Sequence, residues 1–274
     1  MSEEENLDNK IKKFWPKNGP STKKINKYVK KYLKEKIVIK CGGRVLLDPD
    51  LFNNFIEDIV TLKKLGITPV VVHGGGPRIK KRLDELNIET KFIMGLRITD
   101  EKIIKVVEDV MIKFNKEIVD AIEKKSCKAK SITIKENISI YVKQKNKELG
   151  YVGFPTKIDN NIIKNLIKED FIPIVSPMGL GENNKTYNIN ADIAAGALAT
   201  SLKSRRLLLM TDVEGVYNKD KKLIAEIKPE EAEKLIHNNT ISGGMIPKIR
   251  TCINSVENGV RGVVIIDGRK QHSI

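Results

Sequence analysis

The chain has 274 residues, of which 40% are hydrophobic, which is enough to bury the core of one large α/β domain or of two lobes. Its longest apolar runs have only the length of a strand and its first residues are acidic, so we expect no membrane span and no signal peptide, and a cytoplasmic protein. The formal net charge is +15, but the lysines are spread over nearly every segment with few aromatic residues between them. We therefore expect no nucleic-acid partner, although the positive field favours an anionic substrate or an acidic partner protein.

Cysteine and histidine form no metal-binding pattern. The three cysteines are scattered and lack CxxC spacing, and none of the three histidines lies at a ligand spacing from them. We therefore expect no metal site built from protein side chains.

The first 25 residues differ in composition from the rest of the chain. They mix charged side chains with the stretch FWPKNGPS, in which Trp15 is the largest apolar anchor. This composition is typical of a tail or arm. Residues 26–274 have the alternating apolar pattern of a folded domain.

Five short apolar runs that end in turn residues predict buried strands, over residues 36–40, 67–73, 171–177, 206–212 and 262–268. Helical periodicity predicts helices between them, over residues 50–65, 192–202, 229–237 and 247–257, with Gly66 and Gly259 just beyond two of the helix ends. The alternation predicts an α/β fold with a mainly parallel open sheet covered on both faces. Residues 131–144, SITIKENISIYVKQ, break the alternation and predict an antiparallel hairpin.

Residues 68–83, TPVVVHGGGPRIKKRL, place three glycines between a strand and a helix. They form no phosphate-binding P-loop, because the chain has no Gly-Lys dipeptide, and they do not match the GxGxxG fingerprint of dinucleotide-binding proteins. The oxyanion hole of an esterase would require a GxSxG motif, which the chain lacks. Two interpretations stay open: a tight turn, or bare N–H groups beside a helix N-terminus that bind an anion.

Polar residues gather at four strand ends or helix starts. Lys40 ends a strand just before Gly42 and Gly43. The HGGG loop follows the next strand, and a Gly-Gly pair precedes Lys248 at the start of a helix. In the fourth cluster, NINADIAAG, two asparagines precede Asp192, for which a helix N-cap is the alternative role. Two lysines, glycine turns, amides and one carboxylate, without a histidine or cysteine nucleophile, favour phosphoryl transfer by positioning and charge neutralisation.

Together these motifs resemble the amino acid kinase family. The similarity runs from about residue 36 to residue 272, through VIKCGG, PVVVHGGGPRI, GLRITD, YNINADIAAGALA, LLLMTDVEGVY, SGGMIPK and IDGR..H. It implies a three-layer α/β/α sandwich. It also implies an acceptor-binding lobe at about residues 26–180 and an ATP-binding lobe at about residues 181–274.

The resemblance implies a role for each motif. Lys40 and Lys248 would stabilise the transition state from the acceptor side and the nucleotide side, and Asp192 would orient both lysines. The residues implied to bind the acceptor are Gly75, Gly76, Arg97, Asn188 and Asn190. The residues implied to bind the travelling phosphoryl group and ATP are Gly42, Gly43, Asp212, Val213, Glu214, Gly215, Val216, Tyr217, Thr240, Ile241 and Ser242. Gly43 and Gly75 would both offer backbone N–H groups to the travelling phosphoryl group.

The reaction implied is ATP-dependent phosphorylation of the γ-carboxylate of N-acetyl-L-glutamate to an acyl phosphate, in arginine biosynthesis. A carboxylate with a pKa of about 4.3 is already ionised at neutral pH, so a catalytic histidine is not needed. No cluster of protein carboxylates predicts a metal cage, so Mg²⁺ is expected to arrive on ATP. Two alternatives stay open: a kinase of the same family that acts on a glutamate or aminoadipate side chain carried by a small acidic protein, and a basic regulatory protein that kept the fold without activity.

The resemblance also implies a homo-oligomer. Arginine-sensitive members of the family join dimers into hexamers through an N-terminal helix, and residues 21–35, STKKINKYVKKYLKE, have the pattern of such a helix. A solvated lysine-rich helix explains the same pattern equally well. We therefore expect a dimer, or a hexamer if this helix joins dimers.

Overall fold

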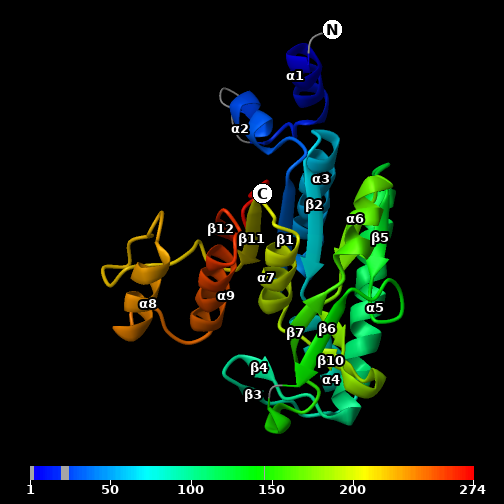
Figure 1. The fold of residues 1–274 in the computed structure, drawn as a ribbon, viewed down its shortest axis with the longest axis vertical. Coiled ribbons are helices and arrows are strands. Elements are labelled where there is room, and N and C mark those ends of the chain that lie inside the picture. Colours follow the sequence, from blue (N-terminus) through cyan, green and yellow to red (C-terminus); the bar gives the residue numbers. More distant parts are fainter. Residues whose placement is uncertain (1–2, 20–24, 145) are drawn as a thin grey trace.

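The structure is a computed structural model that describes residues 3–19, 25–144 and 146–274. Its centre is a six-stranded sheet in the order β12-β11-β1-β2-β8-β5, in which all neighbours are parallel (Figure 1). The strands are β1 (Lys36–Cys41), β2 (Thr68–His73), β5 (Ala129–Ile132), β8 (Ile172–Val175), β11 (Arg206–Thr211) and β12 (Val263–Asp267). The five strands expected from the apolar runs are all present, and β5 extends the sheet at one edge.

Helices cover both faces of this sheet. The helices that pack closest on it are α3 (Pro49–Lys64), α5 (Glu101–Glu123), α6 (Asn160–Lys168) and α7 (Ala191–Ser201). Side chains along β1 alternate between the faces: Ile37 and Ile39 pack with α3 and α5, whereas Val38 packs with α7. Lys40 is on the same side as Val38, which directs it toward α7. The expected three-layer sandwich with a mainly parallel sheet is confirmed.

Smaller sheets lie beyond the C-terminal ends of the central strands. A four-stranded sheet has the order β10-β9-β6-β7, and a two-stranded hairpin pairs β3 with β4. Their bounds are β3 (Phe92–Ile93), β4 (Leu96–Arg97), β6 (Ile140–Gln144), β7 (Gly153–Ile158), β9 (Met178–Leu180) and β10 (Thr186–Asn188).

The hairpin expected over residues 131–144 is wrong. The start of this segment belongs to β5, which pairs in parallel with β8 in the main sheet, and its end is β6, which pairs with β7. Ile132 and Ile140 are both buried in the core against α7 and α6, although they lie in different sheets. The local apolar alternation reports burial, and burial in two sheets produces the same alternation as pairing within one hairpin.

The helix boundaries differ slightly from the expected ones. Gly66 and Gly259 have φ angles of +89° and +99° just after α3 and α9 (Met245–Glu257), and thus terminate these helices as expected. Asn190, not Asp192, is the N-cap of α7, because the Asn190 side chain accepts from the N–H groups of Asp192 and Ile193. Asp192 therefore lies in the first turn of α7, with its carboxylate free for other contacts. Helix α4 (Gly76–Glu85) follows β2, and helix α8 (Pro229–His237) lies between β11 and α9.

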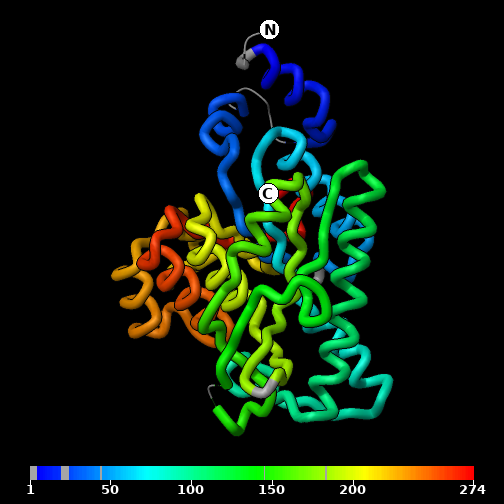
Figure 2. Tube along the Cα trace, turned by 45° about the vertical axis from the view of Figure 1, so that its right-hand side comes forward, coloured from blue at the N-terminus to red at the C-terminus, as the bar shows by residue number. Residues whose placement is uncertain are grey.

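The expected N-terminal arm contains helix α1 (Glu3–Phe14), which is followed by α2 (Ile25–Tyr32). Both lie at the end of the molecule opposite the β3–β4 hairpin (Figure 2). Leu7 and Ile11 pack with Val29 and Leu65 in a small apolar cluster that joins the two helices to the end of α3. Of the helix expected over residues 21–35, residues 21–24 lie outside the described residues. No helix within the described ranges is long and apolar enough to cross a membrane.

Candidate active site

A cavity of about 220 Å³ lies at the C-terminal ends of β1 and β2, the edge of a parallel sheet at which ligands bind. Its walls come from the turns after these strands, the β3–β4 hairpin and the loop before α7. Of the site residues expected from the sequence, the ones that line it are Lys40, Gly42, Gly43, Gly75, Gly76, Arg97, Asn188, Asn190 and Asp192. Four segments far apart in the sequence thus meet at one place.

Asp192 lies between the two lysines of the expected site. Lys40 Nζ is 3.0 Å from Asp192 Oδ1, and Lys248 Nζ donates a hydrogen bond of 2.6 Å to Asp192 Oδ2. The three side chains come from β1, α7 and α9, and each has between 9% and 14% of its surface exposed. Two ammonium groups and one carboxylate leave one uncompensated positive charge at the cavity wall, which suits an anionic ligand.

The titration behaviour of this group follows from burial and charge. Burial alone would raise the pKa of Asp192, but the charges of Lys40 and Lys248 and their hydrogen bonds outweigh it and hold that pKa below its ordinary value. Burial, together with the repulsion of Lys40, lowers the pKa of Lys248, and Asp192 opposes this shift. Asp192 is therefore ionised at neutral pH and acts as the counter-charge of both lysines.

At two positions of the cavity wall, Gly42 and Gly75, the structure leaves no room for a side chain, so the bare backbone faces the cavity. A Cβ atom at Gly42 would lie 2.7 Å from Lys40 Nζ, so any side chain there would displace the ammonium group. A Cβ atom at Gly75 would overlap Met111 Sδ. Gly75 is also the N-cap of α4 and offers no side chain to the N–H groups of the first turn. The start of α4 therefore leaves backbone donors beside the cavity, as anion-binding helix termini do.

Arg97 is a buried cation without a carboxylate partner among the described residues. Its guanidinium donates hydrogen bonds to Thr90 Oγ1 (2.8 Å) and to the carbonyl oxygen of Gly76 (3.3 Å). It also lies 4.7 Å from the ring centroid of Phe92. Burial lowers the pKa of Arg97, and the charge of Asp84 opposes this effect. A guanidinium that is held by neutral groups at a cavity wall can still pair with the carboxylate of a ligand.

The two asparagines of the expected acceptor site differ in how far they are engaged. Asn190 Oδ1 accepts from two backbone N–H groups as the cap of α7, so only its side-chain NH₂ group is left for a ligand. Asn188 ends β10 and lines the cavity, and within the described part of the chain its side chain makes no hydrogen bond. Asn188 is therefore the freer of the two amides.

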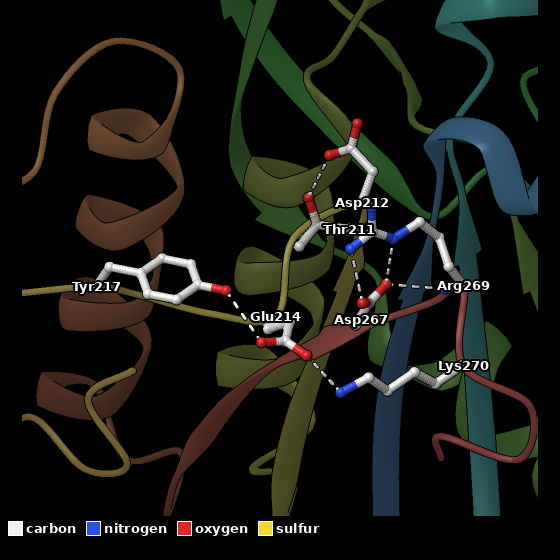
Figure 3. Close-up of polar contacts among 7 residues, drawn as sticks. All are labelled: Thr211, Asp212, Glu214, Tyr217, Asp267, Arg269 and Lys270. Carbon is white, nitrogen blue, oxygen red and sulfur yellow. Dashed lines mark hydrogen bonds and ion pairs between the residues drawn. The ribbon is translucent and has the colours of Figure 1, made fainter. Parts of the chain in front are cut away.

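The residues expected on the nucleotide side lie outside this cavity. Glu214 accepts hydrogen bonds from Lys270 Nζ (2.6 Å) and from the Tyr217 hydroxyl (3.1 Å), as Figure 3 shows. Val216 and Ile241 are buried in an apolar cluster with α9, so their side chains support the lobe that carries Lys248. Of the others, Gly215 is buried, Val213 and Thr240 are half-buried, and Asp212 and Ser242 are exposed. Residues 212–217 and residues 240–242 thus pack with each other and with α9, at a place separate from the acceptor-side cavity.

The chain is similar to known proteins over most of its length. The profile described as "Amino acid kinase family" matches residues 35–267. The chain belongs to the amino acid kinase family. It is 55% identical to the acetylglutamate kinase of Pelagibacter ubique, in an alignment that covers 94% of this chain and 90% of the relative. It is 46% identical to the acetylglutamate kinase of Petrotoga mobilis, over 90% of this chain and 85% of the relative.

A solved structure of a carbamate kinase, the enzyme from Giardia lamblia bound to AMP-PNP, shares the amino acid kinase fold. It has a TM-score of 0.68 and 18% sequence identity, over 86% of this chain and 93% of the other. At this identity the likeness concerns the fold.

Sequence reasoning missed some residues that shape this amino acid kinase cavity. Thr90 and Phe92 hold the Arg97 guanidinium, and Met111 closes the space beside Gly75. Phe92 belongs to the β3–β4 hairpin, so extending the GLRITD motif to the full hairpin would have included it, whereas Thr90 lies before β3. Met111 belongs to the apolar face of α5, and the sequence holds no signal that separates it from ordinary core residues.

Proposed function

We propose that the chain phosphorylates N-acetyl-L-glutamate: it transfers the γ-phosphoryl group of ATP to the γ-carboxylate and forms an acyl phosphate for arginine biosynthesis. The observation that carries this proposal is the carboxylate of Asp192 between Lys40 and Lys248, at the end of a cavity that also holds Arg97. The names of the relatives at 55% and 46% identity support the same reaction and acceptor.

The chemistry requires charge neutralisation more than proton transfer. The acceptor carboxylate is ionised at neutral pH and attacks the γ-phosphorus without a general base. The obstacle is repulsion between this carboxylate and the triphosphate. Lys40 reaches the cavity from β1 on the acceptor side, and Lys248 reaches Asp192 from α9 on the nucleotide side. Both ammonium groups would therefore neutralise the negative charge on the phosphoryl oxygens during transfer, while Asp192 keeps the two lysines in place.

The other end of the acceptor would bind at Arg97. Its guanidinium can pair with the α-carboxylate, and the Asn188 side chain, assisted by the free NH₂ group of Asn190, can bind the acyl-amide end. Gly75 and Gly76 would lie beneath the acceptor, where a side chain would fill the space. These contacts would fix the γ-carboxylate toward Lys40.

ATP would bind along the two segments that pack with α9, residues 212–217 and 240–242, with the phosphates toward Gly42 and Gly43. Within these segments Glu214 is already held by Lys270 and Tyr217, so we assign it a supporting position. Mg²⁺ would arrive on the nucleotide, where it neutralises phosphate charge. Asp192 is not free to bind that ion, because both of its oxygens face a lysine ammonium group.

The proposal also covers the two lobes, the oligomeric state and the cellular location of the protein. We assign residues 26–180 to an acceptor-binding lobe and residues 181–274 to an ATP-binding lobe, from which Asn188 and Asn190 also reach the acceptor, with residues 1–25 as an arm. We also propose a homo-oligomer, in which the docked helices α1 and α2 offer a surface for joining dimers into a hexamer. A cytoplasmic location suits a biosynthetic enzyme that uses ATP.

The proposal is tested by trapping the acyl phosphate with hydroxylamine, using purified protein, MgATP and a panel of acidic acceptors. We expect hydroxamate and ADP in equal amounts with acetylglutamate, and little product with glutamate, acetylaspartate or free aminoadipate. Product only with an acceptor linked to an acidic carrier protein would favour the carrier-linked alternative. Absence of product with every acceptor would overturn the proposed function.

A further inference from the structure

His73, the first residue of the HGGG loop, is fully buried and has no part in the chemistry proposed above. Its Nδ1 lies 3.2 Å from the carbonyl oxygen of Gly74, and its Nε2 lies 3.1 Å from Asn115 Nδ2. Asn115 Nδ2 also donates to the carbonyl oxygen of Ile174 in β8, over 2.9 Å. The ring of Phe114 packs edge-on against His73, with centroids 5.1 Å apart. Side chains of α5 thus connect β8 to the loop after β2.

The two carbonyl groups at the ends of this chain of contacts determine the direction of each hydrogen bond. A carbonyl oxygen only accepts, so His73 Nδ1 donates to Gly74 and Asn115 Nδ2 donates to Ile174. The second hydrogen of Asn115 Nδ2 faces His73 Nε2, which must therefore be unprotonated. The imidazole is neutral, with its proton on Nδ1. Burial lowers the pKa of His73 to about 4, which keeps the ring neutral throughout the neutral pH range.

The hydrogen bond from His73 restrains the peptide group that contains the Gly75 N–H. This peptide is trans, so the Gly74 carbonyl and the Gly75 N–H point in opposite directions. With the carbonyl held toward the buried ring, the N–H is directed away from that ring, and Gly74, Gly75 and Gly76 all line the cavity. Among the residues that the structure describes, none accepts from this N–H. The peptide groups on either side are held, because the Gly74 N–H donates to the Cys41 carbonyl (2.6 Å) and the Gly75 carbonyl accepts from the Ile79 N–H (2.8 Å). Among the described residues, the contact with His73 is thus the hydrogen bond that sets the orientation of the peptide between them, and two glycines permit that peptide to rotate.

We propose that His73 and Asn115 are positioning residues for phosphoryl transfer, which hold the Gly74–Gly75 peptide so that the Gly75 N–H is directed at the transferred phosphoryl group. This inference rests on the proposed kinase function. A donor that is oriented before the reaction needs no reorganisation when negative charge moves onto the phosphoryl oxygens. Neither side chain touches a reactant, so their loss should reduce kcat more than it changes the KM of either substrate.

The decisive comparison is between His73→Asn and His73→Leu. The two variants have almost the same shape and both lose the contact with Asn115, but only asparagine places an N–H at the position of Nδ1. Complete loss of an oriented donor costs about 10²- to 10³-fold in kcat. We expect His73→Leu to lose about 10- to 10²-fold, since the freed peptide still reaches the active orientation part of the time, and His73→Asn to retain at least about tenfold more activity than His73→Leu. Phe114→Leu is the control, because it loosens the same packing without removing a hydrogen bond, and should keep kcat within about threefold of wild type.

Nitrogen-15 NMR of the wild-type protein tests the inference even if a variant fails to fold. We expect a His73 signal with a protonated Nδ1 and an unprotonated Nε2 that does not titrate between pH 8 and about pH 5. A protonated Nε2, or equal kcat values for folded His73→Asn and His73→Leu, would overturn it. If wild-type protein turns over no acidic acceptor, the proposed function and this role fail together, whereas failure of the role alone leaves wild-type turnover intact.

Discussion

Asp192→Asn is the most direct test of the site, because it removes the one negative charge between two lysine ammonium groups. Asparagine keeps nearly the same shape but carries no charge. In the wild type the carboxylate lies 3.0 Å from Lys40 Nζ and 2.6 Å from Lys248 Nζ, and both lysine side chains are at most 12% exposed. The variant would therefore hold two mostly buried ammonium groups side by side without a counter-charge.

The expected magnitude follows from the cost of breaking a buried ion pair. Removing one partner of such a pair destabilises a protein by about 3–5 kcal/mol. We expect the lower end, about 3 kcal/mol, because Lys248 already has a lowered pKa and can release its proton when Asp192 is neutral. For a protein of this size the melting temperature should fall by roughly 6–12 °C.

The assay is thermal and urea unfolding of both proteins, with and without a saturating, non-hydrolysable MgATP analogue. The analogue should raise the melting temperature of Asp192→Asn more than that of wild type, because its phosphates supply the missing negative charge. Asp170→Asn is the matched control: Asp170 pairs with Lys63 over 2.7 Å but is 75% exposed, so its loss should cost less than about 1 kcal/mol. If Asp192→Asn is as stable as this control and gains no more from the analogue than wild type, the two lysines do not depend on Asp192.

Three further predictions concern single residues. Lys248→Ala should lower kcat about 10²- to 10³-fold with a smaller effect on the acceptor KM, because the Lys248 ammonium acts mainly as charge develops on the leaving oxygens. Steady-state kinetics test this, and a kcat within about twofold of wild type would show that Lys248 has no part in the mechanism. Arg97→Ala should raise the KM for acetylglutamate far more than it lowers kcat, and Arg97→Lys should recover little, because a point charge cannot replace the planar guanidinium. Initial rates at saturating MgATP check this, and an unchanged acceptor KM would place the α-carboxylate elsewhere. Because burial lowers the pKa of His73 from 6.5 to about 4, its stabilisation is complete above pH 6.5 and is lost as the pH falls toward 4, by roughly 3 kcal/mol in all. Urea unfolding across this range should show a flatter pH profile for His73→Leu than for wild type, and equal profiles would contradict the buried neutral ring.

The amino-acid sequence by itself determined the class of fold and most of the chemistry. Five of the six central strands are β-branched or leucine-rich runs that end in turn residues, so local periodicity was enough to predict β1, β2, β8, β11 and β12. The lysines and glycine pairs stand directly at strand ends and helix starts, where chain direction alone places them at one edge of a parallel sheet. The ordered motifs then predicted the family, which the profile match over residues 35–267 confirmed.

No local pattern in the sequence specifies which of these groups meet: the family resemblance implied that Asp192 orients both lysines, and only the tertiary structure shows the contact. Lys40, Asp192 and Lys248 are separated by more than fifty residues at each step, and their contact depends on how α7 and α9 pack beside β1. The same limit explains the wrong hairpin over residues 131–144, because alternation records that a side chain is buried but not which strand lies next to it. The proton on His73 Nδ1 is a further case: it depends on the carbonyl groups of Gly74 and Ile174, whose positions no local pattern in the sequence specifies. Local sequence determines which side chains a segment carries. The packing of distant segments determines which partners those side chains contact, and hence their protonation states.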